Sequence, residues 1–126
     1  ELVTLAAAMA LKCRYCILAH GTIFTKNGIS VDQLRLILTN FKDAGLDNTE
    51  VAMMEFAQKI IRKANEITQT DVDTLRALNL EDVEILDITL TATMRSFASK
   101  TFDALGAEPD AVYDELEHEL TDLLPE

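Results

Sequence analysis

The chain has 126 residues, 48% of them apolar, which suits a single domain with a proper hydrophobic core. Its formal net charge of −11, from 22 acidic and 11 basic residues, argues against a nucleic-acid-binding protein, because phosphates would be repelled. No apolar run is long enough to span a bilayer and no signal-like start precedes an apolar block, so we expect no membrane association.

The opening segment carries apolar residues at helical spacing, at Leu2, Leu5, Ala6, Met9 and Cys13. This pattern predicts an amphipathic helix that packs against the core. The sequence starts in mid-pattern, without a methionine or a helix cap. We therefore expect residues to be missing before the first one.

The next stretch, Cys13-Arg14-Tyr15-Cys16-Ile17-Leu18-Ala19-His20, holds both cysteines and one of the two histidines. On a helix, spacings of three and four residues place Cys13, Cys16 and His20 on one face, a turn apart. Two such thiols can close a disulfide when the first lies at a helix start. The histidine can take the Cys16 proton or stabilise its thiolate. We predict a redox-active dithiol, and the absence of a secretory segment favours a reducing, cytoplasmic location.

Three other interpretations of the cysteines stay open. A structural zinc site needs four ligands, whereas only Cys13, Cys16 and His20 lie together and His118 is far along the chain. A Cys2His site with an open water position would suit catalytic zinc. Two cysteines can also simply fill a core, although the histidine four residues on argues against this. We expect no bound metal.

Helix caps divide the rest of the chain. The cysteine segment should be helical to about Lys26, where Asn27-Gly28 is a stop signal, but no Gly or Pro separates it from the opening helix. The later signals are a capping box at Ser30 for a helix to about Phe41, a second at Asp47 and Glu50 for a helix to about Ala64, Thr70 with Asp73 for a helix to about Leu78, a start near Glu81 for a helix to Leu105, and Pro109-Asp110 for the last helix.

The absence of hairpin signals and of sustained alternation predicts an all-α chain of about seven helices in one domain, residues 1–126. The long helix from Glu81 carries its apolar residues at Val83, Leu86, Leu90, Met94, Phe97 and Leu105, and core packing is a sufficient account of the Met and Phe residues. The acidic residues of the last quarter are expected on a solvated helix face, with His118 on the surface.

Glu1, an alanine-rich helix and the Cys13–His20 stretch together resemble the core of the AhpD-like alkyl hydroperoxidases, within the carboxymuconolactone decarboxylase superfamily. That family's pattern is an acid, a dozen residues, then CxxC with a histidine four residues further on. The segment from Thr70 to Asp82 also resembles the family's short helix and next helix start. The resemblance covers most of the chain. It implies an AhpD-like bundle of about six or seven helices, with the CxxC at a helix N-terminus, that assembles into trimers or hexamers.

The resemblance also implies a relay of Glu1, His20, Cys16 and Cys13. His20, polarised by Glu1, would accept the Cys16 proton, and the Cys16 thiolate would attack the peroxide before Cys13 resolves the sulfenic acid. By the logic of thioredoxin-like proteins the first cysteine would attack instead, so the order stays open. Tyr15 stands where some members have an extra histidine. Decarboxylases of the superfamily lack the cysteine pair, which argues against lactone decarboxylation.

The relay requires a break in the helix. In one straight helix Glu1 and Cys13 would lie about 18 Å apart at 1.5 Å per residue. If the chain turns near Lys12 and two helices pack antiparallel, Glu1 approaches His20. We therefore predict a break just before Cys13, which places both cysteines in a first turn where free N–H groups and the helix dipole favour a thiolate.

The sequence thus predicts a thiol-dependent peroxidase that reduces hydroperoxides through a Cys16 sulfenic acid resolved by Cys13. No cofactor is expected. The partners would be the hydroperoxide and an external dithiol or reductase protein, which is lipoyl-bearing or flavin-linked in parts of the family. The alternative is a protein dithiol–disulfide oxidoreductase or redox sensor with little peroxidase activity.

Overall fold

A computed structural model describes the whole chain, residues 1–126. Its seven α-helices are α1 (Leu2–Leu11), α2 (Arg14–Lys26), α3 (Val31–Asn40), α4 (Asn48–Lys63), α5 (Gln69–Ala77), α6 (Asp82–Leu105) and α7 (Asp114–Leu120). Three short 3-10 helices lie between them: η1 (Phe41–Asp43), η2 (Ala64–Glu66) and η3 (Ala111–Tyr113). The chain contains no strand, so the prediction of an all-α chain with about seven helices is confirmed.

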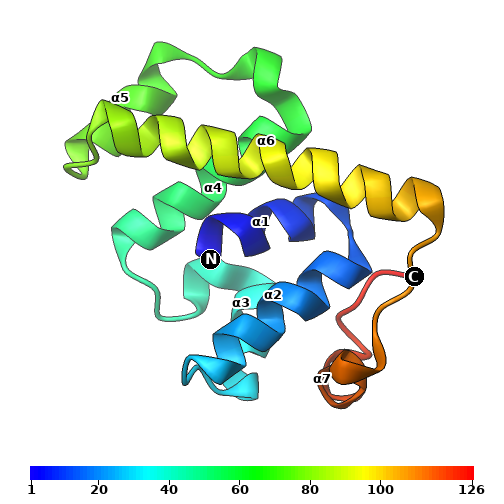
Figure 1. Cartoon of the computed structure of the whole chain (residues 1–126). Helices are drawn as coiled ribbons and strands as arrows, with labels where there is room; N and C mark the ends of the chain where they lie inside the picture. Colours follow the sequence, from blue (N-terminus) through cyan, green and yellow to red (C-terminus); the bar gives the residue numbers. More distant parts are fainter.

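Helix α1 is the central element of the bundle. It lies between α6 and α2 and packs most extensively against α4 (Figure 1). All of residues 3–8 are buried, so α1 is enclosed on every side rather than along one face. The predicted helix is present and packs in the core, but the expectation that it is amphipathic was wrong. The run Ala6-Ala7-Ala8 explains the difference, because small side chains let neighbouring helices approach α1 from several directions.

Most helix starts agree with the caps read from the sequence, with two corrections. Helix α5 is opened by a capping box between Thr68 and Asp71, not by Thr70 with Asp73. The last helix does not begin at Pro109-Asp110. There the chain first forms the single turn η3, and α7 begins at Asp114.

Helix α6 crosses one side of the bundle (Figure 1), and its two faces differ in burial. Its inner face buries Ile85, Ile88, Ala92 and Ser99. Its outer face carries an exposed row that we call the α6 apolar stripe, namely Val83, Leu86, Leu90, Met94 and Phe97, with exposed fractions from 53% to 75%. Met54 and Phe56 of α4 are buried, as expected, but core packing was wrong for Met94 and Phe97, because this face of α6 lies on the surface. No helix, not even this one, has the length and apolar character that crossing a membrane requires.

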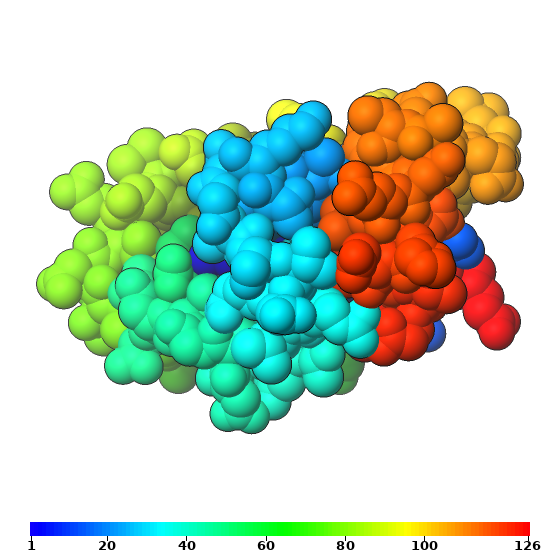
Figure 2. All heavy atoms as spheres, turned by 90° about the horizontal axis from the view of Figure 1, so that it is seen from below, coloured from blue at the N-terminus to red at the C-terminus, as the bar shows by residue number.

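The C-terminal segment, residues 107–126, packs beside α2 and α3 (orange and red in Figure 2). Leu116 and Leu120 of α7 are buried. A Cβ atom at Gly21 would lie 3.1 Å from Leu34 and 3.2 Å from Leu116, so this glycine permits the close approach of α3 and α7 to α2.

Ion pairs fasten this segment to the cysteine-bearing helix and its neighbour. Glu117 pairs with Arg14, and Asp122 pairs with Arg35 at 2.7 Å. The acidic residues of the last quarter are nevertheless exposed, as expected, except for the half-buried Glu117. His118 is exposed, as expected.

Candidate active site

The chain reverses direction between α1 and α2 without a glycine or proline. Lys12 adopts the left-handed conformation, with φ 56° and ψ 36°. Its N–H donates to the Met9 carbonyl at 3.2 Å, and the Cys13 N–H donates to the Ala8 carbonyl at 3.1 Å. This pair of hydrogen bonds is the Schellman arrangement that ends many helices. The break predicted just before Cys13 is present.

Cys13 is the N-cap residue of α2, and its side chain takes part in the cap. Its backbone is extended and its sulfur accepts a hydrogen bond from the Cys16 N–H at 3.4 Å. The two sulfurs lie 2.8 Å apart as free cysteines, with exposed fractions of 0% at Cys13 and 1% at Cys16. The site is therefore a buried, reduced dithiol in the first turn of a helix.

The two thiols have different acidities. The hydrogen bond donated by the Cys13 thiol lowers the pKa of Cys16 to about 6, and the same bond raises the pKa of Cys13. Burial opposes the shift at Cys16, while the Ser99 hydroxyl and the positive charge of Arg95 support it. At neutral pH this arrangement holds Cys16 as a thiolate and Cys13 as a thiol.

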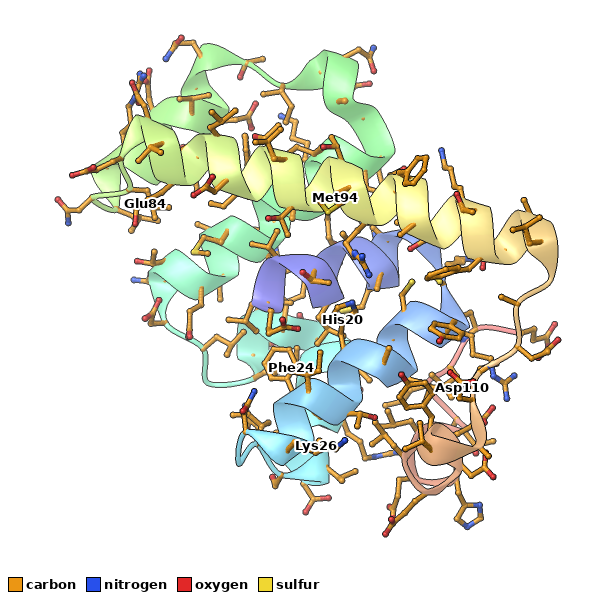
Figure 3. All side chains as sticks on the ribbon, in the orientation of Figure 1. His20, Phe24, Lys26, Glu84, Met94 and Asp110 are labelled. Carbon is orange, nitrogen blue, oxygen red and sulfur yellow. The ribbon has the colours of Figure 1, made fainter.

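His20 and Glu1 meet because α1 and α2 run back past each other. His20 Nδ1 lies 3.0 Å from Glu1 Oε2, and in Figure 3 the His20 side chain lies between α2 and α1. Its other nitrogen, Nε2, lies 2.8 Å from Arg95 Nη1. A guanidinium only donates, so Nε2 accepts and the ring proton is on Nδ1, where it is donated to Glu1. Both ring nitrogens are thereby occupied.

The structure thus brings the four predicted site residues together in two pairs. Cys13 contacts Cys16, and Glu1 contacts His20. No hydrogen bond joins His20 to Cys16. Instead, α6 lies across both pairs, with Ser99 Oγ 3.1 Å from Cys16 Sγ and Arg95 on His20.

Arg95 and Ser99 are the site residues that the sequence did not suggest. They are one helical turn apart, as are His20 and Cys16, so matching spacing on two helices is the signal that could have pointed to them. That signal is weak, because arginine and serine four residues apart occur by chance on many helices.

Aromatic and aliphatic side chains cover the dithiol. Tyr15 packs against Phe102, with ring centroids 5.0 Å apart, and against Tyr113, at 5.9 Å. Its hydroxyl donates to Asp110 at 3.0 Å. Further apolar side chains complete the cover, namely Leu11, Leu38 and Leu124. A reactant must displace part of this cover to reach the sulfur.

The geometry does not supply the ligand set of a zinc site. No three His, Cys, Asp or Glu side chains converge in a way that could hold a metal ion. His20, which both zinc interpretations needed, is directed to Glu1 and Arg95 instead.

Comparison with known proteins gives one family and a set of solved structures. Residues 1–59 match the carboxymuconolactone decarboxylase family. An uncharacterised peroxidase-related protein from Silicibacter sp. TM1040 has 26% sequence identity and a TM-score of 0.83 over 89% of this chain. The structure described as the alkylhydroperoxidase AhpD core, an uncharacterised peroxidase-related protein from Ralstonia eutropha JMP134, has 22% identity and a TM-score of 0.82 over 99% of this chain.

This chain spans 59% and 63% of the length of those two proteins. Comparison with curated proteins gives no significant match. The region matched by the family, residues 1–59, includes Glu1, the dithiol and His20, whereas Arg95 and Ser99 lie beyond it.

Proposed function

We propose that this chain, which belongs to the carboxymuconolactone decarboxylase superfamily, is a thiol-dependent peroxidase of the AhpD-like type. The observation that carries the proposal is the pair of unequal thiols: a Cys16 sulfur with a lowered pKa lies 2.8 Å from the Cys13 thiol. The thiolate is the nucleophilic form of cysteine. A thiol beside it can capture the oxidised sulfur.

The reaction proceeds in two steps at the dithiol. The Cys16 thiolate attacks the terminal oxygen of a hydroperoxide, the O–O bond breaks, and the alkoxide leaves as an alcohol after taking up one proton. Cys16 is then a sulfenic acid. The Cys13 sulfur displaces its hydroxyl group, which leaves as water with the Cys13 proton, and a disulfide forms. An external dithiol reduces this disulfide by thiol–disulfide exchange.

Glu1 and His20 are proposed as the proton relay of the first step. In a molecule whose Cys16 is still protonated, turning of the Arg95 guanidinium away from Nε2 lets His20 accept that proton and later donate it to the departing alkoxide. Glu1, 3.0 Å from Nδ1, stabilises the imidazolium that exists between the two transfers.

The reductant and the setting follow from the same chemistry. A dithiol peroxidase must be re-reduced after each turnover, so the proposed partner is an external dithiol or a reductase protein. A reducing compartment such as the cytoplasm keeps both cysteines as free thiols between turnovers.

The test is peroxide consumption by the reduced protein in the presence of an excess of a small dithiol, with the Cys16→Ser variant as background. We expect consumption well above that background, and mass spectrometry should find a Cys13–Cys16 disulfide after one equivalent of peroxide. Consumption no faster than the Cys16→Ser background would overturn the peroxidase proposal.

That negative result, combined with rapid reduction of disulfide substrates, would favour the alternative function of a protein dithiol–disulfide oxidoreductase. The burial of both sulfurs supports a small substrate over a protein disulfide, because a folded partner has to place its own sulfur in line with the attacking one.

We further propose that the chain forms a homo-oligomer through the α6 apolar stripe. Within the stripe an apolar residue recurs every seven residues, at Val83, Leu90 and Phe97. Helices that pair along their length repeat their contact residues with this period. Monomeric proteins rarely expose so continuous an apolar row. A second copy is the occupant that fits, since the same stripe on two copies is self-complementary about a twofold axis.

A further inference from the structure

Helices α2 and α6 face each other through two matched pairs of polar side chains. On α2, Cys16 and His20 are one turn apart; on α6, Ser99 and Arg95 are one turn apart. Ser99 Oγ lies 3.1 Å from Cys16 Sγ, and Arg95 Nη1 lies 2.8 Å from His20 Nε2. The reactive sulfur and the histidine of the relay therefore each have a partner from the same distant segment.

The Ser99 hydroxyl behaves differently from other hydroxyls on α6. Those of Thr89, Thr93 and Thr101 donate to the backbone carbonyl one turn earlier, which is the usual arrangement within a helix. Ser99 is fully buried, and its hydrogen bond crosses to the Cys16 sulfur instead. A thiolate has no proton to give, so the hydroxyl is the donor in this contact.

Arg95 is a cation held by a chain of hydrogen bonds rather than by an ion pair. Its guanidinium donates to neutral His20, which donates in turn to Glu1 at the exposed end of the chain. The carboxylate charge thus lies beyond the imidazole and does not neutralise the guanidinium directly. The positive charge of Arg95 can therefore stabilise the Cys16 thiolate, which lies one turn from His20 on α2.

We propose that α6 completes the active site, with Ser99 as a catalytic residue that donates to the Cys16 thiolate and Arg95 as a positioning residue that stabilises this thiolate by its charge. In the resting protein Glu1 and His20 hold Arg95 in place. The inference rests on the proposed peroxidase function only for the use made of the thiolate; the stabilisation itself is a property of the reduced protein.

The charged and titratable groups around the sulfur come from three elements. Helix α6 contributes Arg95 and, one turn beyond Ser99 on the other side, Asp103, whose negative charge raises the pKa of Cys16. The first turn of α2 contributes Cys13 itself, and the Glu1–His20 pair joins α1 to α2. Since Arg95 and Asp103 flank Ser99 with opposite charges, their removal should move the Cys16 pKa in opposite directions.

The experiment measures the ultraviolet absorbance of the thiolate against pH in the reduced, full-length protein. Arg95→Gln should raise the Cys16 pKa by roughly 1, the lower end of the range for an opposite charge nearby, and Asp103→Asn should lower it. Lys100→Gln is the matched control, because it removes one positive charge from the same helix at an exposed residue. Equal changes in the Cys16 pKa for Arg95→Gln and Lys100→Gln would overturn the role of Arg95.

Two further variants test the roles more closely. Arg95→Lys keeps the charge and should restore most of the wild-type pKa, which a purely structural role of the guanidinium would not predict. Ser99→Ala should raise the Cys16 pKa. At a pH below the Cys16 pKa of both the wild-type and the Ser99→Ala proteins, the single-turnover reaction with peroxide should then slow about tenfold if the Cys16 pKa rises by about 1. An unchanged pKa in a folded Ser99→Ala protein would overturn the role of Ser99.

These measurements are independent of turnover. If the pKa changes occur but the wild-type protein consumes no peroxide, the role of α6 stands and the proposed function fails. If peroxide is consumed but neither Arg95→Gln nor Ser99→Ala changes the Cys16 pKa, the proposed function stands and the role of α6 fails.

Discussion

The first turn of α2 and the middle of α6 both contact the same sulfur, but the sequence specifies them in different ways. In α2 the contacts are local: Cys13 and Cys16 are three residues apart, and their geometry follows from the N-cap alone. In α6 the contacting hydroxyl lies 83 residues from Cys16 along the chain, on a helix whose more conspicuous feature is the apolar stripe on its opposite face. A local motif supplies the reactive atoms, and a distant segment supplies their electrostatic surroundings.

The largest expected effect comes from substituting the cysteines of the local motif. Cys16→Ser should reduce peroxide consumption to the uncatalysed rate, because it removes the thiolate that attacks the peroxide. Cys13→Ser should behave differently: the first oxidation still occurs, a Cys16 sulfenic acid accumulates, and turnover stops. Chemical trapping of the sulfenic acid with mass spectrometry distinguishes the two variants. Sulfenic acid found on Cys13 in the Cys16→Ser protein, but none on Cys16 in the Cys13→Ser protein, would reverse the assigned order.

The outer face of α6 is tested by its own substitution. Leu90→Glu should dissociate the proposed homo-oligomer to the single chain, because it buries a charge at the centre of an apolar interface. Sedimentation or light scattering measures the molar mass. Leu36→Glu is the control, since Leu36 on α3 has the same exposed fraction of 53% but lies outside the stripe. A wild-type protein that is already a single chain would contradict the proposed interface.

The pH dependence of the first oxidation measures the combined effect of Cys13 in the α2 motif and of Ser99 and Arg95 on α6 on the pKa of Cys16. The pKa of Cys16 is lowered to about 6, so the thiolate is present above this value and is lost as the pH falls through it. The rate constant should be nearly flat from about pH 7 to 8.5 and should fall about tenfold per pH unit well below the Cys16 pKa. Single-turnover kinetics with excess peroxide gives this profile. A rate that still rises between about pH 7 and 8.5 would instead indicate an ordinary thiol, whose pKa is about 8.5.

The smallest expected effect concerns the turn that precedes the dithiol. Lys12 occupies a left-handed conformation that glycine adopts without strain. Lys12→Gly should therefore raise the free energy of unfolding by about 0.5–1 kcal/mol, after the entropy of the more flexible residue is subtracted. Denaturant unfolding measures the change, and Lys26→Gly, inside the last turn of α2, should destabilise the protein instead. A loss of stability in Lys12→Gly would mean that the lysine side chain contributes more than its backbone strain costs.

Much of the fold could be predicted from short-range patterns. Helix periodicity and caps indicated the all-α class, the number of helices and most of their starts, because these features depend on residues within one or two turns. The break at Lys12 could be inferred from the requirement that Glu1 meet His20, although no glycine or proline marks it.

What the sequence could not decide was which side of each helix is buried and what lies opposite the sulfur. Core packing was the expected role of Met94 and Phe97 on α6, yet the packing of α1 against α4 and α6 left them exposed and turned Ser99 inward. Spacing along the chain determines the neighbours of a residue within its own helix. Its neighbours across helices depend on how all the helices fill space together, so Arg95 and Ser99 became visible only in the tertiary structure.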